Sequence, residues 1–351
     1  MIEMDRRTAL ALASSGLTAL AGCSDPTSDG GSNGDEGADS KADSDADASI
    51  ETGDLPAYAS VLAETESEEY FFGAIDLEAL STIASSRGDH EAGENPEDPL
   101  VRNPVAFLIT FQLFSRLGRL PAYDAFADND ETSSDEGHVL LVEGVNVLYG
   151  SFDVDGAEAD LETAGYASAA EGDDFSVFVD EETGDSVGVT PSVFAFASPD
   201  ESAPTFDPRD AVEGIVRADA GDTEPKHATD VDFEWLLRAG TGDGIALCYY
   251  AETEALPTAD LESEQPDEGT EALTFDFSAF EGARGVHQHL SMADDGGAHA
   301  ETVVSYDDEA AVDADRLESR LGSQADSVDL LTDGAAVRVE AEYEGDVVEG
   351  S

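Results

Sequence analysis

The sequence predicts an α+β protein, built mostly from antiparallel sheets with helices on one face. Short apolar stretches follow one another in hairpin-like successions, which are typical of antiparallel strands. A few amphipathic segments with acidic caps and glycine stops lie between them and predict helices. Hydrophobic residues make up 40% of the 351-residue chain, which is enough to form one or two cores.

In the first half of the chain, a strand over 70–75 leads into a helix that Asp76 caps. Asn103 and Pro104 have the pattern of a cap and a first helical residue, and Gly118 and Pro121 end this second helix. The periodicity further predicts strands over 138–142, 145–152, 175–180 and 192–197, and helices over 156–164 and 209–218.

The second half begins with a predicted helix over 232–238 and a buried strand over 245–250 that contains Cys248. The pattern then predicts strands over 273–280, 286–292, 300–306, 329–331 and 336–343, and a helix over 309–321. The order of strand, acidic cap, helix and two strands occurs in both halves, so 148–179 can be aligned with 303–339. This repetition suggests two similar α+β units in tandem, over 55–225 and 226–351.

The charge balance excludes several classes of partner. The chain has 81 Asp and Glu against 15 Lys and Arg, which gives a net charge of −66 at pH 7. Such a surface repels phosphate backbones, so we expect no nucleic-acid partner. It also rules out docking on anionic lipids through a basic patch.

The same imbalance indicates a halophile. Repulsion among so many carboxylates opposes folding in dilute buffer, whereas molar salt screens it. Lys41 and Lys226 are the only lysines, and the other basic residues are arginine. Acidic enrichment with lysine depletion resembles the proteins of haloarchaea.

Residues 1–22 have the pattern of an export signal. The pair Arg6-Arg7 precedes an apolar stretch of about 13 residues, which is too short to span a bilayer. Leu20-Ala21-Gly22-Cys23 then resembles a lipobox, in which small residues let a peptidase reach the bond before the lipidated cysteine. We therefore expect the mature chain to begin at a lipidated Cys23, followed over 23–54 by a disordered acidic tether.

These N-terminal motifs also carry a resemblance to a known family. Together with the segments around 70–80 and 148–166, they resemble haloarchaeal lipoproteins exported by the twin-arginine route. The resemblance implies a location at the extracytoplasmic face of the cell membrane, with the lipid as the membrane contact. It brings no catalytic residues.

Few residues indicate specific chemistry. We expect no cofactor, because the sequence lacks a phosphate-binding glycine loop, a dinucleotide fingerprint, a nucleophile elbow, a cysteine pair and a His-Glu-X-X-His motif. His287 and His289 are two residues apart on a predicted strand, so both imidazoles lie on the same face of the sheet. His299 lies on the next predicted strand, and it shares this face if the residue numbers of paired residues add up to an even number. This arrangement suggests a zinc or copper site, with exposed bystander histidines as the alternative.

Residues 99–123 are the longest stretch of the mature chain without Asp or Glu. One interpretation is a helix buried in the core, where an unpaired carboxylate is costly. The other is a docking face, in which Phe107, Phe111 and Phe114 are exposed toward a protein partner or the membrane.

We therefore expect a lipid-anchored, extracytoplasmic protein that is not an enzyme and acts by interaction at the cell surface. One alternative is a solute- or metal-binding lipoprotein of a transport system, and a deep cleft between lobes would support it. The other alternative is an exported hydrolase, and a compact His/Ser/Asp cluster in a pocket would support it. The sequence does not identify a small-molecule ligand.

Overall fold

The computed structural model describes residues 49–86, 96–110, 113–133, 136–200, 203–240, 242–253, 255–256, 275–293 and 297–344. The export and lipidation residues Arg6, Arg7, Leu20, Ala21, Gly22 and Cys23 lie outside these ranges, and so does Phe111. In the part of the chain that is described, no helix is long and apolar enough to cross a membrane.

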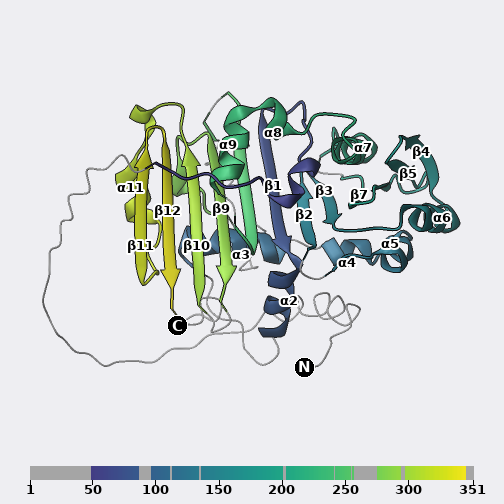
Figure 1. The fold of residues 1–351 in the computed structure, drawn as a ribbon, viewed down its shortest axis with the longest axis horizontal. Helices are drawn as coiled ribbons and strands as arrows, with labels where there is room; N and C mark the ends of the chain where they lie inside the picture. Colours follow the sequence, from purple (N-terminus) through teal and green to yellow (C-terminus); the bar gives the residue numbers. More distant parts are fainter. Residues whose placement is uncertain are drawn as a thin grey trace, which may run out of the picture.

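A 12-stranded sheet runs through the whole described fold (Figure 1). Its order is β11-β12-β10-β9-β8-β1-β2-β3-β7-β6-β5-β4, and every neighbouring pair is antiparallel. The predicted α+β class with an antiparallel sheet is confirmed. The strands are β1 Glu69–Asp76, β2 His138–Val142, β3 Val145–Tyr149, β4 Ala167–Glu171, β5 Ser176–Val179, β6 Ser186–Val189, β7 Val193–Ala197, β8 Ile245–Ala251, β9 Gly285–Met292, β10 Ala298–Ser305, β11 Ser327–Asp333 and β12 Ala336–Tyr343.

Helices pack on both faces of this sheet, so the expectation of one helical face is wrong. The α-helices are α2 Leu77–Ser86, α3 Pro99–Thr110, α4 Leu113–Leu117, α5 Tyr123–Asn129, α6 Val154–Ala164, α7 Pro208–Asp219, α8 Lys226–Thr229, α9 Val231–Ala239 and α11 Ala314–Arg320. Short 3-10 helices are η2 Ala57–Val61, η3 Ser278–Phe280 and η4 Glu309–Ala311. One core contains side chains of α3, α6 and α11, and the other contains side chains of η2, α7 and α9.

The central strands explain why two cores are needed. Along β8, Ile245, Leu247 and Tyr249 belong to one core, whereas Ala246, Cys248 and Tyr250 belong to the other. A strand that is apolar on both faces must be covered on both, because its side chains alternate. The sheet therefore forms the middle of three layers.

The order of strands is repeated on either side of the β1–β8 pair. Outward from this pair lie β2, β3 and β7 on one side and β9, β10 and β12 on the other. In chain order, each half begins with three consecutive strands, β1 to β3 and β8 to β10. The third of these strands is followed by a helix, which is α6 after β3 and α11 after β10. Strand β7 pairs with β3, and β12 pairs with β10, so β7 is the counterpart of β12. The alignment of 148–179 with 303–339 would instead match β12 with β5, which is not the match that the sheet shows.

The helix in residues 99–123, the segment without Asp or Glu, begins about one turn earlier than predicted. Pro99 is the first residue of α3, and the carboxylate of Asp98 accepts a hydrogen bond from the backbone N–H of Leu100 at 3.2 Å. Asn103 does not cap a helix. Its side chain is fully buried and donates to Asp276 O and to Gln288 Oε1, at 2.9 and 2.8 Å. Sequence alone could not separate two similar cap-proline pairs five residues apart.

Two further expectations need correction. Residues 275–277 lie outside any strand and Ser278–Phe280 form η3, so the strand over 273–280 is wrong where it is described. The acidic tether also ends earlier than residue 54. Ile50 is buried, its N–H donates to Asp333 Oδ2 at 3.0 Å, and Gly53 N–H donates to Arg238 O at 2.8 Å.

Helix α3 is a core helix, which contradicts the docking interpretation for Phe107. Phe107 is 1% exposed, and its ring lies over Gly73 of β1, where a Cβ would clash with the ring. Phe114 of α4 is half-buried and packs against the same core. Phe111 lies outside the described residues. The missing carboxylates are therefore explained by burial of α3 on β8, β9 and β10.

We predict that Phe107→Ala lowers the free energy of unfolding by about 3–5 kcal/mol, because it empties a filled site over Gly73. The matched control is Phe114→Ala, which removes a half-buried ring and should cost distinctly less. Chemical unfolding in molar salt, followed by circular dichroism, measures both. Equal and small losses would contradict the core assignment of α3.

Candidate functional site

The strand register brings the three predicted histidines to one face of the sheet. His287 and His289 of β9 pair with Val303 and Glu301 of β10, and His299 pairs with Ser291. The residue numbers of each pair add up to the even number 590, so His299 lies on the same face of the sheet as His287 and His289. The geometric part of the expectation is therefore met.

The metal-site hypothesis itself is wrong for these residues. His287 is 2% exposed, its ring nitrogens bond to no other side chain, and the backbone of Gly240 lies against its Nδ1. Its ring lies 5.9 Å from that of Phe72, and its register partner on β8 is Cys248. His299 instead pairs with Glu342 at 2.9 Å near the surface. Among the described residues, no three His, Cys, Asp or Glu side chains are grouped so that they could hold a metal ion.

Burial keeps the two inner histidines neutral. Desolvation and, to a lesser extent, the neighbouring His289 lower the pKa of His287 from 6.5 to about 3, although the backbone of Gly240 opposes that shift. Desolvation also lowers the pKa of His289, although the Asp243 backbone and the carboxylates of Asp243 and Asp76 oppose that shift. Both side chains belong to the core at pH 7.

A caged lysine is the most unusual charged group of the fold. Lys226, at the start of α8, is fully buried in a chain with 81 acidic residues and only two lysines. Its Nζ lies 5.4 Å from the ring centre of Tyr70 and 5.8 Å from those of Phe233 and Tyr250. Ammonium groups at such distances are attracted by the electron-rich ring faces.

Two carboxylates complete this cage. Glu252 Oε1 lies 2.5 Å from the ammonium nitrogen of Lys226, and Glu64 Oε1 lies 3.6 Å from it. Both carboxylates are more than a third exposed, so they remain solvated while the lysine does not. The lysine backbone is held as well, because Lys226 N–H donates to Leu62 O at 2.8 Å. The sequence signal for this site is the rarity of lysine, because no motif surrounds Lys226.

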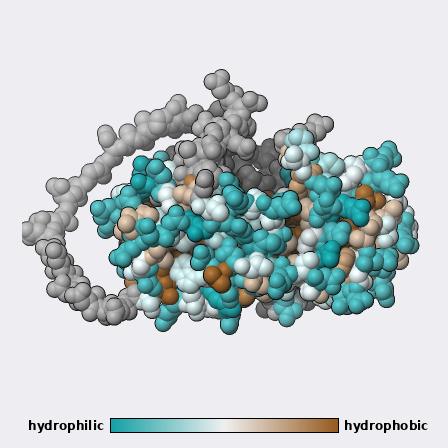
Figure 2. All heavy atoms as spheres, turned by 90° about the horizontal axis from the view of Figure 1, so that it is seen from above, coloured by the Kyte–Doolittle hydropathy of each residue, from teal (hydrophilic) through white to brown (hydrophobic). Residues whose placement is uncertain are grey.

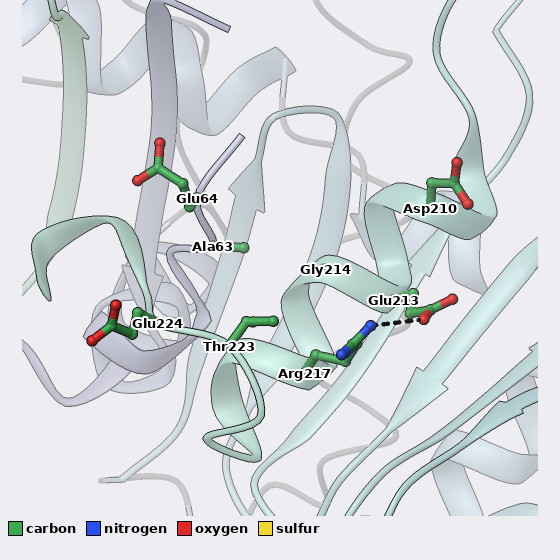
Figure 3. A pocket seen from close by; sticks show the side chains of 8 residues that line it. All are labelled: Ala63, Glu64, Asp210, Glu213, Gly214, Arg217, Thr223 and Glu224. Atoms are coloured by element: carbon green, nitrogen blue, oxygen red, sulfur yellow. Dashed lines mark hydrogen bonds and ion pairs between the residues drawn. The ribbon is translucent and has the colours of Figure 1, made fainter. Parts of the chain in front are cut away.

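An acidic groove lies beside the cage, between α7 and the loops that contain Glu64 and Glu224 (Figure 3). Its volume is about 370 Å³. The lining residues are Ala63, Glu64, Asp210, Glu213, Gly214, Arg217, Thr223 and Glu224. Arg217 Nη1 pairs with Glu213 at 3.4 Å within the helix, so the groove presents a net negative charge. It favours cations over anions.

A hydroxyl cluster at the end of α7 has no histidine partner among the described residues. Ser60, Thr190 and Ser192 donate to the carboxylate of Asp219 at 2.8, 2.6 and 2.5 Å. Nucleophilic serines need a base that takes the hydroxyl proton, and histidine usually serves. Here the three hydroxyl groups anchor α7 to η2 and to the β6–β7 turn.

The described surface is strongly polar. Figure 2 shows one face on which hydrophilic residues dominate, with small and scattered hydrophobic spots. Val231 and Val328 are the large hydrophobic residues exposed in the described ranges. Such isolated positions do not form an apolar patch.

No protein-family model matches the chain, and no curated protein matches it. Among solved structures, the chain is similar to one titled "Structure of crystal form I of TP0453". The TM-score is 0.34 and the identity 10%, over 83% of this chain and 94% of that one. A likeness of this degree supports no statement about function.

We predict that Lys226 and Glu252 are strongly coupled. A double-mutant cycle with Lys226→Met and Glu252→Gln should give a coupling energy of about 1–3 kcal/mol, because the ammonium is desolvated. The control cycle uses Arg238 and Glu234, a half-buried pair four residues apart in α9 in which neither side chain is fully desolvated, and for which about 0.3–0.5 kcal/mol is expected. Denaturant unfolding in molar salt measures both cycles. Equal coupling in the two pairs would show that the cage adds nothing.

Proposed function

We propose that this chain is a lipid-anchored protein at the extracytoplasmic face of a haloarchaeal membrane, where it acts by interaction and not by catalysis. The observation that carries the proposal is Cys23, placed directly after Leu20-Ala21-Gly22 and downstream of Arg6-Arg7. This order of export signal, lipobox and acidic linker is the one that a tethered surface protein needs.

The described fold supports this role in two ways. Ile50 is the first buried side chain of the described ranges and is bound to Asp333, and 26 residues lie between it and Cys23 in the sequence. Its surface exposes no large apolar patch over the described residues, so membrane contact through the lipid is the simpler arrangement. An acidic surface of this kind receives cationic groups of a partner.

The alternatives are less well supported. In a transport-type binding protein, a ligand lies in a cleft between two lobes, but here β1 and β8 join the two halves by direct strand pairing. In a serine hydrolase, a histidine would contact the nucleophile, but the Ser60, Thr190 and Ser192 hydroxyl groups all bond to Asp219.

We predict that Cys23→Ser releases the protein from the membrane. Without its thiol the chain cannot receive a thioether lipid, and the described surface offers no apolar substitute. Fractionation in molar salt should recover the variant in the soluble fraction or the medium. Cys248→Ala is the matched control, because it removes the other cysteine and should leave the membrane fraction unchanged. Retention of Cys23→Ser after high-salt washing would overturn the anchor.

We also predict that the fold requires high salt. Transfer from molar salt to 0.1 M salt lengthens the Debye length from about 3 to about 10 Å and restores repulsion among the carboxylates. Ellipticity and the thermal midpoint should both fall during dialysis. An unchanged midpoint in dilute buffer would contradict the halophilic interpretation.

A further inference from the structure

Strand β11 forms one end of the 12-stranded sheet, so one of its two sides has no partner strand among the described residues (Figure 1). On that side, the N–H and C=O groups of alternate residues point away from the sheet. Five of its seven residues are exposed, and Ile50 binds the end of the strand through the carboxylate of Asp333. An open strand edge of this kind can pair with another strand.

This edge lacks several features that commonly prevent such pairing. Strand β11 contains no proline and no basic residue, and its seven pairs with β12 follow one register without a bulge. The opposite end of the sheet, β4, is shorter, and its register shifts between Ser168 and Ala170. Because bulges and short strands disfavour pairing at an edge, β11 is the edge that can accept a further strand.

The two carboxylates of β11 restrict which strand can pair with it. Asp329 and Asp333 are both exposed. Like charges directly opposite each other destabilise a strand pair. A partner strand must therefore place residues other than Asp and Glu opposite these two positions.

A second copy of β11 meets this requirement when the two copies pair antiparallel over their full length. Leu330 is then opposite its own counterpart. Asp329 is opposite Leu331, and Asp333 is opposite Ser327, so no two acids face each other. With the same faces of the two sheets kept together, the neighbouring registers differ by two residues. One of them places Asp329 opposite itself, and the other places it opposite Asp333.

We propose that β11 pairs antiparallel with β11 of a second copy, which joins the two sheets into one. The twofold axis passes between the two Leu330 residues, and the contact closes at two chains because each copy contributes the same edge. Val328, which is 38% exposed, then packs against Thr332 of the second copy. This dimer goes beyond the surface role proposed above and does not depend on the lipid anchor.

Molar salt permits the two copies to approach. Each carries a net charge of −66, so they repel each other in dilute buffer. In molar salt the Debye length is about 3 Å, which screens this long-range repulsion. Backbone hydrogen bonds and apolar contacts between the two edges act at short range and remain.

Sedimentation of the full chain in molar salt tests whether the dimer forms. The Cys23→Ser background removes the thiol of the expected anchor, so failure of the anchor does not affect the result. The mass should rise with protein concentration from 36.7 kDa toward twice this value and then stay constant. A constant mass of 36.7 kDa, or continued growth into larger assemblies, would overturn the proposal.

Cysteine cross-linking in the same background tests the register. Residues 328 and 332 of the two copies lie opposite each other, with Cβ atoms about 5 Å apart. Each residue lies four positions, or about 13 Å, from its own counterpart. A mixture of Val328→Cys chains and Thr332→Cys chains should therefore give a disulfide-linked dimer under mild oxidation, whereas each variant alone should not. Both positions are exposed, so the variants should fold, and Cys248 is buried.

The matched control uses the same spacing at the other end of the sheet. A mixture of Ala167→Cys chains and Glu171→Cys chains of β4 should give no cross-linked dimer. Absence of the dimer in the β11 mixture, equal cross-linking of either β11 variant alone, or equal cross-linking of the β4 mixture would each overturn the proposal. In the first case, a dimer detected by sedimentation would have to use another surface.

Discussion

The pairing of β1 with β8 is the constraint on which the rest of the structure depends. These strands lie at the centre of the sheet and join the two halves over seven residue pairs, from Glu69↔Ala251 to Ile75↔Ile245. Both strands have apolar side chains on both faces, so neither face can be left to water. The two helical layers follow from this requirement, since each must cover one side of the same central pair.

The caged lysine sits on this junction. Tyr70 and Tyr250 are register partners in the β1–β8 pair, and the Lys226 ammonium lies over both rings. In a chain of net charge −66, a cation here is attracted by the overall field as well as by Glu252 and Glu64. A group that would be costly to bury alone is thus stabilised by rings and carboxylates from both halves.

Local signals predicted local structure well. The helix predicted over 156–164 is α6, which Asp153 caps through the N–H of Gly156 and which Gly165 ends with a positive φ of 99°. Glu143 and Gly144, both at positive φ, form the turn between β2 and β3. The weak strands β4 and β6 were missed, because alanine, serine and glycine give them little β-pattern. The site was predicted less well, since spacing aligned the histidines but could not show that His287 is enclosed.

The sequence by itself determined the α+β class, the strand-rich pattern and the excess of acidic residues, because these properties depend on composition and on periodicity over a few residues. Only the tertiary structure decided that one sheet unites both halves, that β7 and not β5 matches β12, and that Lys226 is caged. It also decided that Gly240 and Gly242 cover the histidines. These features depend on contacts between residues far apart in the chain, whose pairing no local pattern specifies.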